Sequence, residues 1–157
     1  MVVKLLMGNE AIAHGAIEAG VQVAAAYPGT PSSEVLGTLA AMAGEYGFYA
    51  EWSINEKAAL ETAAGASLAG ARALAAMKQV GLNVAADPLM SLAYIGVKGG
   101  LVLVVADDPG PHSSQTEQDT RKFAQFAKLP VLDPSNPAEA REMTKYAFVL
   151  SEKLLLP

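Results

Sequence analysis

The run Leu-Val-Leu-Val-Val-Ala, from Leu101 to Ala106, decides the fold class of this chain. Every residue in it is apolar, and valine and leucine in such a short run are typical of a strand. A strand with one wet face alternates apolar and polar side chains, whereas a continuous apolar run indicates burial on both faces. This stretch therefore predicts a parallel sheet covered by helices on both sides.

On either side of this run, short Val/Ala/Leu/Tyr segments alternate with longer Ala-rich segments of helical period, punctuated by glycine. The alternation predicts one α/β domain, a three-layer α/β/α fold with a central, mostly parallel sheet and right-handed crossovers. We expect strands over residues 21–27, 48–52, 71–77, 101–106 and 131–132. We expect helices over residues 8–19, 31–46, 53–70, 82–97 with a break at Asp87-Pro88, 119–128 and 137–154.

The amino-acid composition limits which ligands and partners this chain can bind. Hydrophobic residues make up 52% and charged residues 17% of the 157 residues, which fits a doubly covered sheet and partner surfaces, a homodimer included. The net charge of -5, without a basic cluster, argues against a nucleic-acid partner. The absence of cysteine excludes iron–sulfur ligation by this chain. No run approaches the roughly 18 apolar residues of a membrane span, so we expect a cytoplasmic protein with no membrane partner.

Sheets of this class bind ligands beyond the carboxyl ends of their strands, so the segments that follow each strand are the candidates. The first is Tyr27-Pro28-Gly29-Thr30-Pro31-Ser32-Ser33, which presents hydroxyls and backbone N–H groups at a helix start and suits a carboxylate or phosphate. Simple helix capping, with Thr30 as N-cap and Pro31 at the first helical position, is the alternative interpretation.

Glu56 is the second candidate, in the first turn of the helix that follows the strand at residues 48–52. A carboxylate sheltered from water at that position can act as an acid or a base. Ser53-x-x-Glu56 also matches a capping box, in which the glutamate only bonds back to the Ser53 amide. Spacing alone leaves both interpretations open.

Two further segments carry polar groups. Lys78 lies at a strand end, before a turn expected at Gly81, and could hold an anionic substrate group or be a solvated lysine. The loop at residues 109–121 follows the most apolar strand and contains His112, Ser113 and Arg121. Polar loops in that place tend to carry function. The alternative is a surface connector with a solvated His112 and with Asp119 capping the next helix.

Several nucleotide and hydrolase motifs are absent. The chain has no G-x-G-x-x-G, no G-x-x-x-x-G-K-[ST] and no G-x-S-x-G. Dinucleotide-binding, P-loop and α/β-hydrolase interpretations therefore lose their main support.

Together, the quoted segments resemble the amino-terminal, pyrimidine-binding domain of indolepyruvate:ferredoxin oxidoreductase α subunits, which are thiamine-diphosphate-dependent 2-oxoacid oxidoreductases. The resemblance spans nearly the whole chain, and its order and spacing make it specific. It is carried by Met7-Gly8-Asn9-Glu10-Ala11, the Tyr27–Ser33 segment, Asn55-Glu56-Lys57-Ala58-Ala59, Gly81-Leu82-Asn83-Val84-Ala85-Ala86-Asp87-Pro88 and Ser113-Ser114-Gln115-Thr116-Glu117-Gln118-Asp119.

The resemblance implies a transketolase-like fold in which a helix glutamate, matching Glu56, bonds N1′ of the cofactor's aminopyrimidine and favours the tautomer that deprotonates thiazolium C2. It implies cofactor contacts at Pro28, Gly29 and Thr30. Substrate contacts are expected at the residues whose segments border the same cavity: Thr30, Ser32, Lys78, His112, Ser113 and Arg121. The family has histidine where this chain has Gln79, so a proton-transfer role does not carry over to that position.

The chain lacks the Gly-Asp-Gly motif that holds the diphosphate and Mg²⁺ in this enzyme class. We therefore expect residues 1–157 to be a single pyrimidine-binding domain, the amino-terminal part of a longer subunit, and inactive alone. Mg²⁺ and the iron–sulfur clusters are expected on other domains or chains. The implied partners are a diphosphate-binding domain, a second oxidoreductase subunit, ferredoxin and coenzyme A.

Two other functions stay open from the sequence. One is a non-catalytic small-molecule-binding or assembly module that keeps the fold and has lost the chemistry. The other is the equivalent domain of a different thiamine enzyme, such as a decarboxylase or another 2-oxoacid oxidoreductase.

Overall fold

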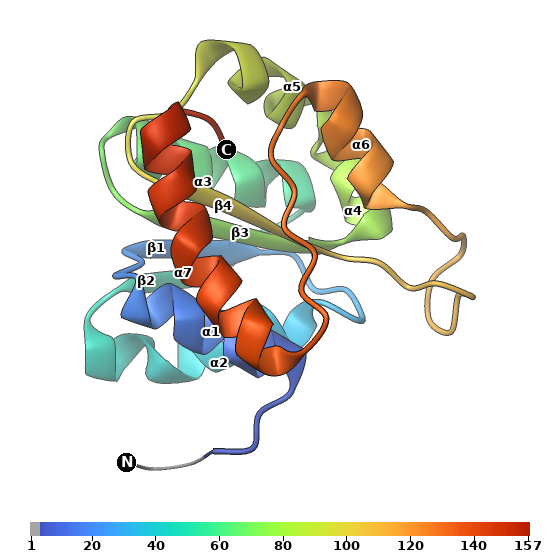
Figure 1. Ribbon diagram of the computed structural model, residues 1–157, viewed down its shortest axis with the longest axis horizontal. Coiled ribbons are helices and arrows are strands. Elements are labelled where there is room, and N and C mark those ends of the chain that lie inside the picture. The colour runs from blue at the N-terminus through green and yellow to red at the C-terminus, as the bar shows by residue number, and fades with distance from the viewer. Residues whose placement is uncertain (1–3) are drawn as a thin grey trace.

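The computed structural model describes residues 4–157, and its strands form one parallel sheet (Figure 1). The order across the sheet is β2-β1-β3-β4, so the predicted α/β class is confirmed. The strands are β1 (Val23–Ala26), β2 (Tyr49–Trp52), β3 (Ala73–Lys78) and β4 (Leu101–Ala106). The helices are α1 (Gly8–Glu18), α2 (Ser33–Tyr46), α3 (Glu56–Leu68), α4 (Gln79–Val84), α5 (Ala86–Ile95), α6 (Thr120–Ala127) and α7 (Pro137–Leu154).

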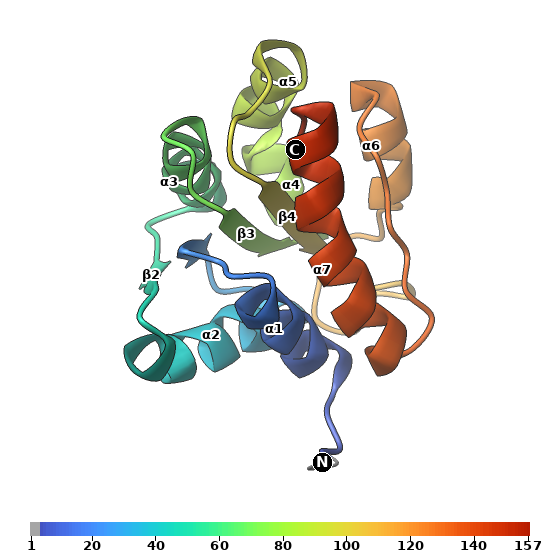
Figure 2. The ribbon, with the colours of Figure 1, turned by 60° about the vertical axis from the view of Figure 1, so that its left-hand side comes forward.

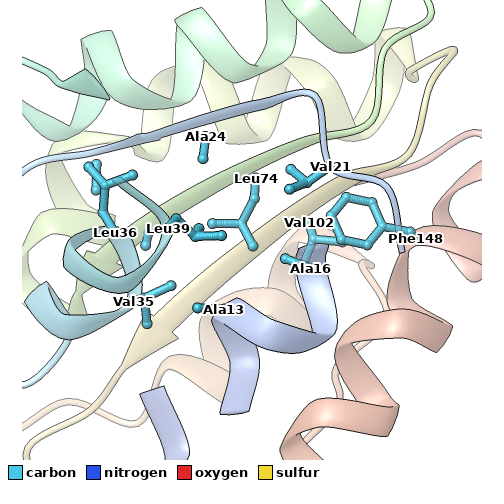
Figure 3. Close-up of a cluster of buried hydrophobic side chains, with 12 residues drawn as sticks. Ala13, Ala16, Val21, Ala24, Val35, Leu36, Leu39, Leu74, Val102 and Phe148 are labelled. Carbon is cyan, nitrogen blue, oxygen red and sulfur yellow. The ribbon is translucent and has the colours of Figure 1, made fainter. Parts of the chain in front are cut away.

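One face of the sheet packs against α1, α2 and α7. Leu74 of β3 points into this core, where it lies with Leu36 and Leu39 of α2 and Phe148 of α7 (Figure 3). Ala76, two residues further along β3, belongs to the same cluster. All five side chains are buried. Because side chains of a strand alternate between its faces, the residues between them must serve the opposite side.

The opposite face packs against α3, α4 and α5 (Figure 2). Ala73, Ala75 and Met77 of β3 point this way and are fully buried with Leu60 of α3 and Leu82 of α4. With helices on both sides of the parallel strands, the molecule has the three-layer arrangement that the sequence predicts.

The position of β4 differs from the expectation that it is buried on both faces. It lies at the edge of the sheet, and its last four residues, from Leu103, are only partly buried. The strand predicted at Val131-Leu132 is wrong, because residues 128–136 form no strand beside β4. Pro130 and Pro134 flank that pair, and proline provides no N–H for a ladder.

The predicted helix over residues 82–97 is two helices. The chain turns at Ala85 instead of at Asp87-Pro88, and the first of the two helices already begins at Gln79. Pro88 lies in the first turn of α5, where its missing N–H breaks no hydrogen bond. Among the described residues 4–157, no helix has both the length and the apolar character needed to cross a membrane.

Helices α1 and α7 lie side by side, although they are far apart in the sequence (Figure 2). A Cβ added at Gly15 of α1 would come 2.5 Å from the Arg141 carbonyl oxygen of α7, so the two backbones approach closely there. Arg141 also pairs with Glu18 at 2.6 Å, which joins the same two helices at the surface. Glycine at position 15 therefore permits this helix contact.

Candidate functional site

The carboxyl ends of the strands lie along one edge of the sheet. Ala26 is in register with Trp52 and with Ala76, and Lys78 is in register with Ala106. The turn after β1, the start of α3, helix α4 and the loop after β4 therefore all begin at this edge (Figure 1). The structure thus brings the candidate segments to the part of the fold where ligands of parallel α/β sheets bind.

Glu56 lies in the first turn of α3 and is 8% exposed. The predicted start of this helix at Ser53 is wrong, since Asn55 is the N-cap and its side chain accepts from the Ala58 N–H at 2.8 Å. The Ser53 hydroxyl instead donates to Glu51 at 3.2 Å. The capping-box interpretation therefore fails, and the Glu56 carboxylate is not used to close its own helix.

The Glu56 side chain rests on helix α4. A Cβ added at Gly81 would lie 2.6 Å from both Cγ and Oε1 of Glu56. Gly81 belongs to α4 and not to a turn, which corrects the expectation of a glycine turn after Lys78. Within residues 4–157, no hydrogen bond of the structure involves the Glu56 carboxylate, so packing alone restrains it.

The start of α3 is also tied to α5. Lys57 donates to Asp87 at 2.7 Å, which connects the first turns of the two helices. The Asp87 carboxylate is the main cause that raises the pKa of the Lys57 ammonium. The residue next to Glu56 is therefore held, while the Glu56 carboxylate is left without an ionic partner in the described part of the chain.

The turn after β1 closes on itself before α2 begins. Both the N–H and the hydroxyl of Ser32 donate to the Gly29 carbonyl, at 2.7 and 2.8 Å, and the Gly29 N–H donates to the Ser33 hydroxyl at 2.9 Å. Ser32, not Thr30, is the N-cap of α2, so the prediction of Thr30 as N-cap with Pro31 at the first helical position is wrong. Pro31 lies in this turn and follows a cis peptide bond.

Four predicted site residues meet beside this turn. The Lys78 side chain crosses Gly29 so closely that a Cβ there would lie 2.8 Å from Lys78 Cδ. The Ser113 hydroxyl donates to the Thr30 carbonyl at 3.2 Å, and Lys78 Nζ lies 3.5 Å from the Ser113 carbonyl oxygen. The structure thus brings the ammonium group of Lys78 between two candidate segments that are far apart in the sequence.

The loop after β4 is built around Asp108, a residue that sequence reasoning did not single out. The backbone N–H groups of Ser113, Ser114 and His112 all donate to Asp108 Oδ2, at 2.9, 3.0 and 3.1 Å. Backbone hydrogen bonds, foremost from Ser113, lower the pKa of the Asp108 carboxyl to about 2. An aspartate directly after a strand and before Pro-Gly is a turn signal that could have identified it.

Gln79 fastens the same loop to the sheet and is fully buried. Its amide oxygen accepts from the Asp108 N–H at 3.1 Å, and its amide nitrogen donates to the Thr116 carbonyl. Both ends of the side-chain amide are therefore satisfied by loop backbone. This structural role explains why a polar residue is buried at this position.

His112 and Arg121 lie at the outside of the loop. His112 is exposed, and Arg121 pairs with Asp119 at 2.8 Å and with Asp133 at 3.0 Å. Asp119 is the N-cap of α6, as the alternative interpretation predicts. Arg121 lines a cavity of about 700 Å³ between β4, α6 and α7, and Glu56, Thr30 and Lys78 are not among its lining residues.

Comparison with known proteins decides the family. Residues 14–157 match the family described as pyruvate flavodoxin/ferredoxin oxidoreductase, thiamine diphosphate-binding. This chain belongs to that family. The resemblance that the sequence motifs carry is thereby confirmed at the level of the family.

Relatives of this oxidoreductase family are similar over nearly the whole chain. The chain is 61% identical to indolepyruvate oxidoreductase subunit IorA of Archaeoglobus fulgidus over 97% of its length, and 62% identical to the subunit of the same name from Thermococcus kodakarensis over 95%. It spans 25% and 23% of those proteins, so about a quarter of the length of the curated relatives.

A solved structure shows the same fold. The 2-oxoglutarate:ferredoxin oxidoreductase from Magnetococcus marinus, with 2-oxoglutarate, coenzyme A and succinyl-CoA bound, superposes with a TM-score of 0.81 over 97% of this chain and 28% of that chain. The sequence identity is 23%. This likeness supports the assignment of the fold and extends to no individual site residue.

Proposed function

We propose that this chain forms the pyrimidine side of a thiamine diphosphate site in an enzyme that oxidatively decarboxylates indolepyruvate. The observation that carries the proposal is Glu56, a carboxylate that is 8% exposed at the ligand-binding edge of a sheet of this family. Among residues 4–157 no hydrogen bond uses up its acceptor oxygens. A sheltered carboxylate with free oxygens can hold a proton for a bound ring nitrogen.

The residues present fit this cofactor. Glu56 would accept a proton-sharing hydrogen bond from N1′ of the aminopyrimidine, and the absence of a side chain at Gly81 leaves its carboxylate in place. Pro28, Gly29 and Thr30 would border the ring, because their turn lies at the same edge of the sheet. When bound, thiamine diphosphate would supply a thiazolium ring whose C2 carbon can add to a 2-oxoacid carbonyl and which can take up the electron pair left when carbon dioxide departs.

The substrate carboxylate would lie near Lys78. The ammonium group lies beside the Thr30–Ser113 contact and has no carboxylate partner within the described residues, so it is free to pair with an anion. Thr30 would add a hydroxyl there, whereas the hydroxyls of Ser113 and Ser32 already donate to backbone carbonyls. Roles of His112 and Arg121 stay predictions, and each would require the loop or a partner chain to approach the substrate.

The remainder of the site belongs to other parts of the enzyme in this proposal. The chain has no Gly-Asp-Gly motif and no cysteine, so Mg²⁺, the diphosphate and the iron–sulfur clusters would be held elsewhere. Residues 1–157 would be one amino-terminal domain of a longer subunit that works with a second subunit. Ferredoxin would take the electrons and coenzyme A the acyl group, in the cytoplasm.

A different 2-oxoacid is the second candidate. The Magnetococcus marinus enzyme of the same fold is named for 2-oxoglutarate. Identities of 61% and 62% to indolepyruvate oxidoreductase subunits, against 23% to that enzyme, favour the aryl substrate. Steady-state rates of the complete enzyme with indolepyruvate, pyruvate and 2-oxoglutarate would separate the candidates.

Replacing Glu56 by glutamine in the complete enzyme tests the proposal. Glutamine keeps the shape but cannot take up the proton, so kcat should fall by roughly 10²–10⁴-fold. The thermal unfolding midpoint should stay near that of the wild type, because no hydrogen bond within residues 4–157 is lost.

The decisive measurement is hydrogen–deuterium exchange at C2 of bound thiamine diphosphate, followed by NMR after acid quenching. Glu61→Gln is the matched control, since it makes the same chemical change at an exposed position of the same helix. If Glu56→Gln exchanges C2 as fast as the wild type, Glu56 does not activate the cofactor and the pyrimidine-side role proposed for it is wrong. If the wild-type enzyme neither binds thiamine diphosphate nor exchanges its C2 proton, the non-catalytic binding or assembly module becomes the better description.

A further inference from the structure

Gly81 lies directly under the Glu56 carboxylate. A Cβ built at this glycine would meet three Glu56 atoms, Cγ and Oε1 at 2.6 Å and Cδ at 2.8 Å. Contacts of ordinary side chains begin near 3.4 Å, so a residue with a Cβ cannot occupy position 81 while Glu56 stays where it is. The glycine and the carboxylate are therefore coupled through space, although they lie on different helices.

Backbone conformation does not explain this glycine. Gly81 is the third residue of α4, and its φ is not in the left-handed region that favours glycine. Glycine inside a helix is destabilising relative to alanine. The approach of Glu56 is thus the feature of the structure that requires a bare Cα at this position.

We propose that Gly81 is the positioning residue for Glu56. Without a side chain at position 81, the carboxylate lies against the backbone of α4. Because no hydrogen bond within residues 4–157 holds this carboxylate, the contact with Gly81 sets its place. The inference rests on the proposed function, since it concerns where Glu56 meets the pyrimidine.

An added methyl group should move the carboxylate and spare the fold. All three atoms nearest to the built Cβ belong to the far end of a flexible side chain, and none belongs to the backbone. Relief of the clash requires Glu56 to shift by about 1 Å, and a misplacement of that size at a reacting group can cost on the order of 100-fold in rate. Helix α4 itself gains an alanine, which favours the helical state.

The test compares Gly81→Ala with Gly65→Ala in the complete enzyme. Gly65 is a helical glycine of α3, the helix that carries Glu56, and a Cβ there meets nothing within 4 Å. We expect Gly81→Ala to lower kcat and C2 hydrogen exchange of bound thiamine diphosphate by about 100-fold. KM, cofactor affinity by calorimetry and the unfolding midpoint should stay near wild type, and Gly65→Ala should change none of these.

A double-mutant cycle separates positioning from general damage. In the Glu56→Gln background, Gly81→Ala should lower C2 exchange by less than about threefold, because the group that it displaces no longer takes the proton. If Gly81→Ala only disturbed the structure, its fold-decrease in C2 exchange would instead multiply with the fold-decrease caused by Glu56→Gln.

Three results would overturn the inference. In the first, C2 of the bound cofactor exchanges at the wild-type rate in the Gly81→Ala enzyme but more slowly in the Glu56→Gln enzyme. Glu56 then keeps its proposed role, and only the positioning role of Gly81 is wrong. In the second, Gly81→Ala lowers the unfolding midpoint by more than about 4 °C, which means that the added methyl group clashes with something other than the Glu56 side chain. Finally, an unaffected Glu56→Gln enzyme would remove the proposed function and this inference together.

Discussion

Two buried carboxylates lie at the same edge of the sheet, and the molecule holds them in opposite ways. Asp108 is 7% exposed and accepts three backbone hydrogen bonds, whereas Glu56 is 8% exposed and is held by contact with Gly81. Equal burial therefore does not imply equal purpose. A carboxylate whose lone pairs are filled organises a loop, while one with free oxygens can bind a ligand.

Acidification should give the largest difference between the two carboxylates. Hydrogen bonds from the backbone of Ser113 and its neighbours lower the pKa of Asp108 to about 2. The stabilisation that this gives is complete above the ordinary aspartate pKa, near 4, and is lost as the pH falls through about 2. The amide NMR signals of His112, Ser113 and Ser114 should then move together with a midpoint near pH 2.

Amides of β3 are the control for this titration, because they move only if the whole domain unfolds. Movement of the three loop amides with an ordinary aspartate midpoint near pH 4 would contradict the structural role given to Asp108.

Gln79→Ala should give the next largest effect, and it acts on the loop that contains the hydrogen-bonded Asp108. It leaves the Asp108 N–H and the Thr116 carbonyl without their buried partner, at about 1–3 kcal/mol each. We expect the free energy of unfolding in urea to fall by roughly 3 kcal/mol. Gln125→Ala, at an exposed position of α6, should change it by less than about 0.5 kcal/mol. Equal effects of the two variants would show that Gln79 does not fasten the loop.

Asn55→Ala should have the smallest effect, and it acts on the start of α3, the helix that carries Glu56. Loss of the 2.8 Å bond from the Ala58 N–H should lower the free energy of unfolding by about 1 kcal/mol. Ser53→Ala is its comparison, since Ser53 does not cap α3 and only donates to Glu51 at 3.2 Å. A larger loss for Ser53→Ala than for Asn55→Ala in urea unfolding would restore the capping box that the structure replaces.

Local patterns in the sequence are sufficient to predict the layers of this fold. The apolar runs at residues 73–77 and 101–106 lie in strands, and the glycines at positions 20 and 47 follow the helix ends with φ of 74°. Sheet order is not encoded in any one run, so the apolar β4 could not be placed at the edge from its composition. Val131 and Leu132 have high strand propensity, but the prolines on either side donate no N–H groups and no strand within residues 4–157 pairs with this segment, so it forms no strand.

The site was harder to predict because several residues could start the same helix. Ser53 and Asn55 are both good N-caps, two residues apart, and only the geometry shows that Asn55 is used and that Glu56 is left free. Thr30 and Ser32 present the same ambiguity before α2. Asp108, Gln79 and Gly81 act through contacts between segments distant in the sequence, which no local pattern encodes.

The close contact of α1 with α7 bears on how the chain folds during synthesis. The Glu18–Arg141 pair spans 123 residues, so α1 leaves the ribosome long before its partner helix exists. At 5–20 residues per second, the face of α1 around Gly15 waits roughly 6–25 s for α7. Throughout that interval the apolar surface that α7 later covers stays exposed, and exposed apolar surface of this kind is prone to aggregate.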